Sequence, residues 1–156
     1  MSVAVVERWL EAPLRQFVED AQVMLALILT PSGQVLGQHG FTRAIDVMSA
    51  CALAAAIQAS SAELGRQLQA EPFGGLHHTG IERQMFLASV ETPRGPLLCL
   101  TVFDEATSFG LVQIYYDELR HRLAQAAPGP RPTPSDVLAE TFGQDLDRNL
   151  ALLFRR

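Results

Sequence analysis

The residues best suited to proton chemistry are two adjacent acids, Asp104 and Glu105, in the stretch CLTVFDEATSFGLVQIYY. They follow an apolar run, and a carboxylate pair at the end of a buried strand is an arrangement that general acid–base enzymes use. The same acids suit the start of a helix, where they oppose the positive end of the macrodipole and Thr107 or Ser108 supplies the cap. We favour the structural interpretation, and an enzyme or small-molecule sensor that uses the two acids stays an alternative.

Other reactive side chains do not form a recognisable site. His77 and His78 are neighbours on a predicted strand, so they face opposite sides and do not ligate one ion without a distortion. Neither Cys51 nor Cys99 lies at ligand spacing from a histidine or beside a base. The chain also lacks the G-x-S-x-G elbow, the phosphate-binding loop G-x-x-x-x-G-K-[ST] and G-x-G-x-x-G. The sequence therefore predicts no catalytic residue, no metal and no cofactor.

Composition narrows the class of protein. The 156 residues are 48% hydrophobic and 19% charged, which is typical of one globular domain with a short appendage. A net charge of -5 without clustered basic residues argues against nucleic-acid binding. Both cysteines lie in apolar runs, which favours buried, reduced thiols in a cytoplasmic protein. We find neither a signal peptide nor a run of about 18 apolar residues, so no membrane insertion is expected.

Hydrophobic periodicity predicts the order helix, two strands, helix, three strands, helix, linker, helix. The helices are expected over residues 3–21 (kinked or restarted at Pro13), 42–69, 107–126 and 135–156. The strands are expected over residues 23–30, 35–40, 76–80, 83–91 and 96–103. Short hairpins make the sheet mostly antiparallel, and strands that are apolar on both sides require cover on both faces. The predicted fold class is α/β (α+β), with a five-stranded sheet between helices.

The helix predicted over 42–69 is apolar on two sides. Its bulky stripe should lie on the sheet and consists of Leu53, Ile57, Leu64 and Leu68. The opposite side is small and apolar and consists of Met48, Ala52, Ala55, Ala59 and Ala62. A helix that is apolar all round is normally buried on both sides, so we expect the second side to pack against the same helix of a second copy. The alternative is that alanine, a strong helix former, is simply tolerated on the surface.

The C-terminal part of the chain is predicted to be an appendage. Residues 127–134 form a proline-rich linker, and residues 135–156 form an amphipathic helix. Its narrow apolar stripe, with residues four apart, consists of Phe142, Leu146, Leu150 and Phe154. Such a helix on a tether suits docking into a groove of a partner or of the protein's own dimer, and cover for the protein's own surface is the alternative.

The segments HHTGIERQMFLASV and PLLCLTVFDEATSFGLVQIYYDEL resemble the second half of the Roadblock / dynein light chain family. The segment VMLALILTPSGQVLGQHG is similar to that family's first hairpin, and the likeness covers about residues 12–126 of a domain placed at 1–126. Within the family the chain most resembles the bacterial MglB type, which also continues beyond its third helix. The resemblance implies an antiparallel sheet with the middle helix on one face, the other two helices on the opposite face, and a homodimer built through the middle helices and neighbouring strand edges.

The resemblance also implies a function. The expected role is that of a non-enzymatic, homodimeric regulator of a small Ras-like GTPase of the MglA type, which promotes hydrolysis or controls nucleotide exchange. The alternative is a structural adaptor of the light-chain kind, without effect on GTP turnover. Regulators of the MglB type reposition the GTPase's own catalytic groups, so no residue is assigned a catalytic role, although Arg43, Arg66 and Arg83 are available to approach a phosphate.

Overall fold

The computed structural model describes residues 7–129 and 134–153, with the side chains of residues 44 and 134–142 left out. Five strands form one sheet: β1 (Leu25–Leu29), β2 (Val35–Gly40), β3 (Gly75–Thr79), β4 (Gln84–Thr92) and β5 (Gly95–Phe103). Their order across the sheet is β2-β1-β5-β4-β3, and all four neighbouring pairs are antiparallel. The predicted five-stranded antiparallel sheet of an α+β fold is confirmed.

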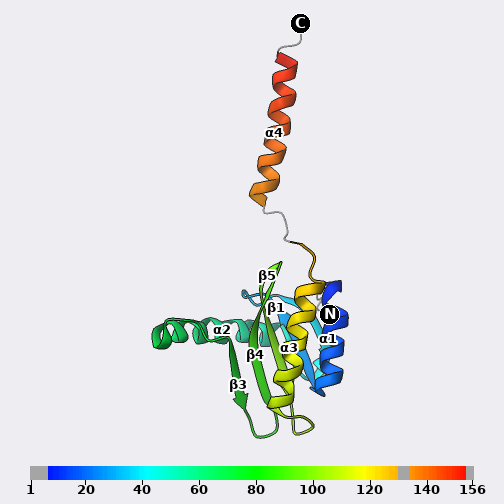
Figure 1. Cartoon of the computed structure of the whole chain (residues 1–156), viewed down its shortest axis with the longest axis vertical. Coiled ribbons are helices and arrows are strands. Elements are labelled where there is room, and N and C mark those ends of the chain that lie inside the picture. Colours follow the sequence, from blue (N-terminus) through cyan, green and yellow to red (C-terminus); the bar gives the residue numbers. More distant parts are fainter. Residues whose placement is uncertain (1–6, 130–133, 154–156) are drawn as a thin grey trace.

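Helices cover both faces of this sheet (Figure 1). The helices α1 (Arg8–Ala21) and α3 (Phe109–Ala126) lie side by side on one face, and α2 (Val47–Gln69) crosses the strands on the other. All five residues of β1 are buried because its alternating side chains enter both layers. The packing of these two hydrophobic layers determines which surfaces of α2 and β3 remain exposed.

The starts of the first two helices differ from the sequence expectation. Helix α1 begins at Arg8 and continues through Pro13, so it does not restart at that proline. Residues 3–6 of the predicted helix lie outside the described residues. Helix α2 begins at Val47, because Thr42–Ala44 forms a separate 3-10 turn. Asp46 is the N-cap of α2, and its Oδ1 accepts a hydrogen bond from the backbone N–H of Ser49 at 3.2 Å. A side-chain cap of this kind fixes where a helix begins.

The fourth helix, α4 (Pro134–Leu153), stands apart from the sheet in Figure 1. Its range agrees with the predicted C-terminal helix, while residues 154–156 and linker residues 130–133 lie outside the described residues. The side chains of Leu146 and Leu150 are exposed.

Among the described residues, one helix is long and apolar enough to cross a membrane by length and composition alone. This helix is α2, with a mean hydropathy of 1.3 over its most apolar 18 residues. The helix is interrupted by polar and charged residues, so it does not contain the continuous run of about 18 apolar residues that the sequence analysis looked for. The hydropathy has a simple origin, because one side of α2 packs on the sheet and leucines occupy another.

Candidate interaction surface

The side of α2 that packs on the sheet is built from small residues. Cys51, Ala54, Ala55 and Gly65 are its buried positions. They face an apolar sheet surface formed by Leu25, Leu27, Leu29, Leu87, Leu98 and Leu100. Since the sheet already supplies large side chains, small residues on the helix let the two layers approach closely and fill the space between them.

The three leucines of the predicted sheet-facing stripe point away from this layer, which corrects the sequence expectation for them, whereas Ile57 packs against the layer as expected. Leu53, Leu64 and Leu68 are exposed to 64%, 51% and 70%, and Ile57 is half-buried. Three leucines on one flank of one helix are an apolar patch of the kind that marks protein interaction sites. We call Leu53, Leu64 and Leu68 the leucine stripe.

The residues predicted to form the dimer interface differ in exposure. Met48, Ala52 and Ala59 are exposed, and Ala62 is half-buried. Ala55 is buried against the sheet in the single chain, whereas the sequence analysis assigned it to the dimer interface. Ala55, Ala59 and Ala62 instead help to wall a hollow of about 320 Å³ beside Pro72 and Phe73.

Strand β3 lies at an edge of the sheet. It pairs with β4 along Gly75–Thr79, and the sheet order ends with it. An edge strand presents unpaired backbone N–H and C=O groups that a second strand can bond. In Figure 1 the C-terminal end of α2, which carries Leu64 and Leu68, projects past this strand. The free edge and the C-terminal end of α2 therefore lie on the same side of the domain.

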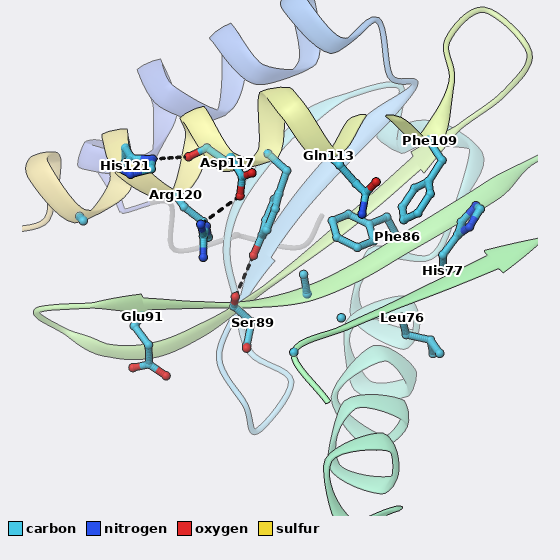
Figure 2. A pocket seen from close by; sticks show the side chains of 15 residues that line it. Leu76, His77, Phe86, Ser89, Glu91, Phe109, Gln113, Asp117, Arg120 and His121 are labelled. Carbon is cyan, nitrogen blue, oxygen red and sulfur yellow. Dashed lines mark hydrogen bonds and ion pairs between the residues drawn. The ribbon is translucent and has the colours of Figure 1, made fainter. Parts of the chain in front are cut away.

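A groove of about 800 Å³ separates α3 from β3 and β4 on the opposite face of the sheet (Figure 2). Aromatic side chains form its inner part: the His77 ring stacks on Phe109 with centroids 3.8 Å apart, and Phe86 meets Tyr116 edge to face. The Tyr116 hydroxyl donates to the Ser89 carbonyl at 2.8 Å. Burial raises the pKa of Tyr116 well above its usual range, so the phenol stays a protonated donor.

The rim of this groove carries charged side chains, and two of them form an ion pair. Arg120 forms an ion pair with Asp117 at 3.0 Å, and His121 Nδ1 lies 2.7 Å from the Asp117 carbonyl (Figure 2). The only serine in the lining is Ser89, and no cysteine belongs to it. Its chemistry suits contact with another polypeptide rather than nucleophilic catalysis.

The acid pair lies outside every described hollow. Asp104 Oδ1 accepts from the backbone N–H of Ala106 at 2.9 Å, so it stabilises the turn after β5. Ser108 is the N-cap of α3, as expected, and its Oγ accepts from the Leu111 N–H at 3.3 Å. The sequence suggested that the two acids oppose the positive end of the α3 macrodipole. Neither acid lies in the first turn of α3, because both belong to the turn before it.

These positions give a stability prediction. Replacing Ser108 with alanine should lower the free energy of unfolding by about 1 kcal/mol, because the Leu111 N–H loses its acceptor. Glu105→Gln should change the same quantity by less than about 0.5 kcal/mol, as for a surface position without a structural role. Urea denaturation measures both. A larger loss for Glu105→Gln than for Ser108→Ala would show that the acid has a role that its position does not explain.

The remaining candidates are separated by the fold. Cys51 and Cys99 are free thiols, and they belong to the layers on opposite faces of the sheet. Burial raises the pKa of Cys51 to about 11 and that of Cys99 to about 12, which leaves both thiols protonated at neutral pH. His77 Nε2 lies 2.8 Å from Gln84 Oε1, and His78 is exposed. Within residues 7–129 and 134–153, no three His, Cys, Asp or Glu side chains gather as metal ligands would.

The three arginines singled out in the sequence are dispersed. Arg43 lies in the 3-10 turn before α2, and Arg83 lies just before β4. Arg66, on α2, pairs with Glu63 at 3.1 Å. All three are exposed. Of the predicted docking stripe on the C-terminal helix, Leu146 and Leu150 are described, whereas Phe154 and the side chain of Phe142 lie outside the described residues.

Comparison with solved structures identifies the fold. No protein-family model matches the chain, and no curated protein matches it either. A Roadblock/LC7 domain from Streptomyces avermitilis is similar at a TM-score of 0.58 and 15% identity, over 74% of this chain and 92% of that one. The fold is therefore Roadblock-like.

Two solved MglB structures are more similar still. Myxococcus xanthus MglB superposes with a TM-score of 0.70 at 22% identity, over 76% of this chain and 86% of that one. The gliding protein MglB from Thermus thermophilus gives 0.67 at 19% identity, over 81% and 98%. The fold is of the MglB type, and at these identities the likeness concerns the fold alone.

Proposed function

We propose that this protein is a homodimeric, non-enzymatic regulator of a small Ras-like GTPase of the MglA type. The observation that carries the proposal is an exposed leucine stripe on α2 next to a free β3 edge, in a fold of the MglB type. The regulator acts by protein contacts, so the groups that hydrolyse GTP belong to the partner.

A homodimer would cover both the leucine stripe and the free β3 edge. Leucines exposed on a two-fold axis bury one another, and the same axis can bring two β3 edges together. Both surfaces are self-complementary, since a leucine stripe pairs with a leucine stripe and an antiparallel edge pairs with its own copy. The dimer interface therefore centres on Leu53, Leu64 and Leu68, with Met48, Ala52 and Ala59 at its margin.

The chain organisation supports a regulator with a separate docking element. In this proposal a Roadblock-like domain at 1–126 is followed by a linker at 127–134 and a C-terminal helix at 135–156, of which the structure describes α4 (Pro134–Leu153). The exposed Leu146 and Leu150, four residues apart on α4, suit the helix-in-groove mode of binding. We assign this helix to a partner contact of the cytoplasmic dimer.

The adaptor alternative predicts binding without a change in turnover. Binding of the chain to its cognate GTPase is measured by calorimetry, and release of a fluorescent GDP analogue is followed with and without the chain. A regulator must bind one state of the GTPase more tightly than another, because a ligand without differential affinity shifts no equilibrium. Equal affinity for the GTP-bound and GDP-bound forms, together with unchanged exchange and hydrolysis, would favour the adaptor.

A further inference from the structure

A cavity lies at one end of the sheet, apart from the groove and from the proposed dimer interface. The β1–β2 turn contributes Thr30, Pro31 and Gln34, and the β4–β5 turn contributes Arg94. The start of α1 closes it with Glu7 and Trp9, and Leu36, Pro96 and Leu97 complete the lining. Its volume is about 330 Å³, which lies at the lower end of the range for small-ligand sites.

Two residues of the lining each carry a buried donor nitrogen without an acceptor. Trp9 Nε1 and Arg94 Nε are both buried, and neither has a hydrogen-bond partner in the structure. Four such side-chain atoms occur among the described residues, and two of them belong to this one lining. Both nitrogens can only donate, so the group that would satisfy them must carry lone pairs. Buried donors without partners are rare because leaving them unpaired is unfavourable.

The charge of the lining favours an anion over a neutral acceptor. Arg94 is always protonated and forms no ion pair among the described residues, whereas its guanidinium matches the geometry of a carboxylate. Glu7 is the only acid among the described residues of the lining, and it already has an interaction of its own. The rest of the wall is largely apolar, through Pro31, Leu36 and Leu97.

We propose that this cavity binds a carboxylate carried on a small apolar group, with Arg94 and the Trp9 indole as its donors. The apolar group packs against the proline and leucine walls, which excludes water and strengthens the charged contact. Two sources supply this chemistry, namely a free small carboxylic acid or the C-terminal carboxylate of a peptide. The site is independent of the proposed GTPase partner and would remain if that proposal failed.

The single tryptophan makes the test direct. Trp9 is the only tryptophan of the chain, so a ¹⁵N-labelled sample of the full protein gives one indole N–H cross-peak. The probes are 4-methylpentanoate, acetyl-glycyl-leucine and the C-terminal amide of that dipeptide. A saturable shift of the indole peak is expected with at least one acid and none with the amide. A shift with 4-methylpentanoate alone identifies a small acid, and a shift with the dipeptide acid extends the site to chain termini.

Variants tie the shift to the cavity. Arg94→Ala should weaken binding by about tenfold or more, since the charged partner of the carboxylate is removed. Arg83→Ala, which removes an exposed arginine from the β3–β4 hairpin, is the matched control and should leave the affinity unchanged. The remaining cross-peaks report whether each variant is folded. No saturable shift with any probe up to about 10 mM, or an unchanged dissociation constant for Arg94→Ala, would overturn the proposal.

Discussion

Replacing Leu53 and Leu64 with arginine is expected to convert the homodimer into a folded monomer. Both side chains are more than half exposed in the single chain, so arginine is solvated there and the fold is kept. In the dimer the same two positions would bury unpaired charges in place of leucines. Substitution at two central interface positions should lower the free energy of dimer association by about 4 kcal/mol, which raises the dimer dissociation constant roughly a thousandfold. Sedimentation equilibrium measures that constant.

The matched control is Ala59→Arg on the other exposed flank of α2. Ala59 belongs to the alanine face that the sequence assigned to the interface, so the two variants compare the two faces directly. We expect Ala59→Arg to weaken the dimer far less than the double variant. If Ala59→Arg dissociated the dimer while Leu53→Arg/Leu64→Arg left it intact, the dimer interface would lie on the alanine face and not on the leucine stripe.

Gly65→Ala is expected to destabilise the domain although it improves helix propensity. A Cβ atom on Gly65 would lie 2.5 Å from the Phe73 nitrogen and 2.8 Å from the Glu71 carbonyl oxygen. Both contacts are with backbone, so the segment that leads into β3 must move. The gain in helix propensity is about 1 kcal/mol and overpacking costs about 1–3 kcal/mol, so the net loss of stability should reach up to about 2 kcal/mol. Urea denaturation measures it.

The same exchange at Gly143 is the control for propensity. Gly143 is a helical position of α4, and a Cβ there would meet nothing within 4 Å. Gly143→Ala should therefore leave the unfolding of the domain unchanged and raise helix content, if anything. Gly65→Ala should also weaken the dimer, because Gly65 fixes the approach to the β3 edge. A Gly65→Ala protein as stable as the wild type would show that the chain after α2 does not depend on that close approach.

The sheet and its layers follow from the sequence because local patterns decide them. The β1 and β5 runs are apolar on both faces, which required helices on both sides. Helix α3 carries Val112, Tyr116 and Leu119 at helical spacing, and all three are buried. Its start at Ser108 could be predicted because a cap is a local interaction between a side chain and a nearby N–H.

The orientation of α2 could not be predicted from the same pattern. Periodicity shows that a helix has two apolar sides and does not say which one faces the protein's own sheet. The leucines of β1, β4 and β5 already fill that layer, so the side with Cys51 and Gly65 packs inward. The leucine stripe is thereby left to a partner. The expected dimer interface thus included Ala55, which the fold uses internally.

No pattern in the sequence indicated the cavity that Trp9 and Arg94 line. Trp9 and Arg94 are 85 positions apart in the numbering and meet only because two hairpin turns and the start of α1 lie at the same end of the sheet. Neither residue belongs to a motif, and the absence of acceptors for their N–H groups is visible only in three dimensions. Asp104 differs from these residues because its contact is local, although it stabilises the turn after β5 and does not lie in the first turn of α3, as the sequence had suggested.

Multiple-turnover phosphate release from the cognate GTPase tests the central claim most directly. The reaction is measured without the chain, with the wild-type chain at saturating concentration, and with the Leu53→Arg/Leu64→Arg monomer. We expect the wild-type dimer to raise the rate by about tenfold or more, which corresponds to at least about 1.4 kcal/mol of barrier lowering, and the monomer to have little effect. An unchanged rate with a tightly bound wild-type dimer, or full stimulation by the monomer, would contradict a dimeric regulator.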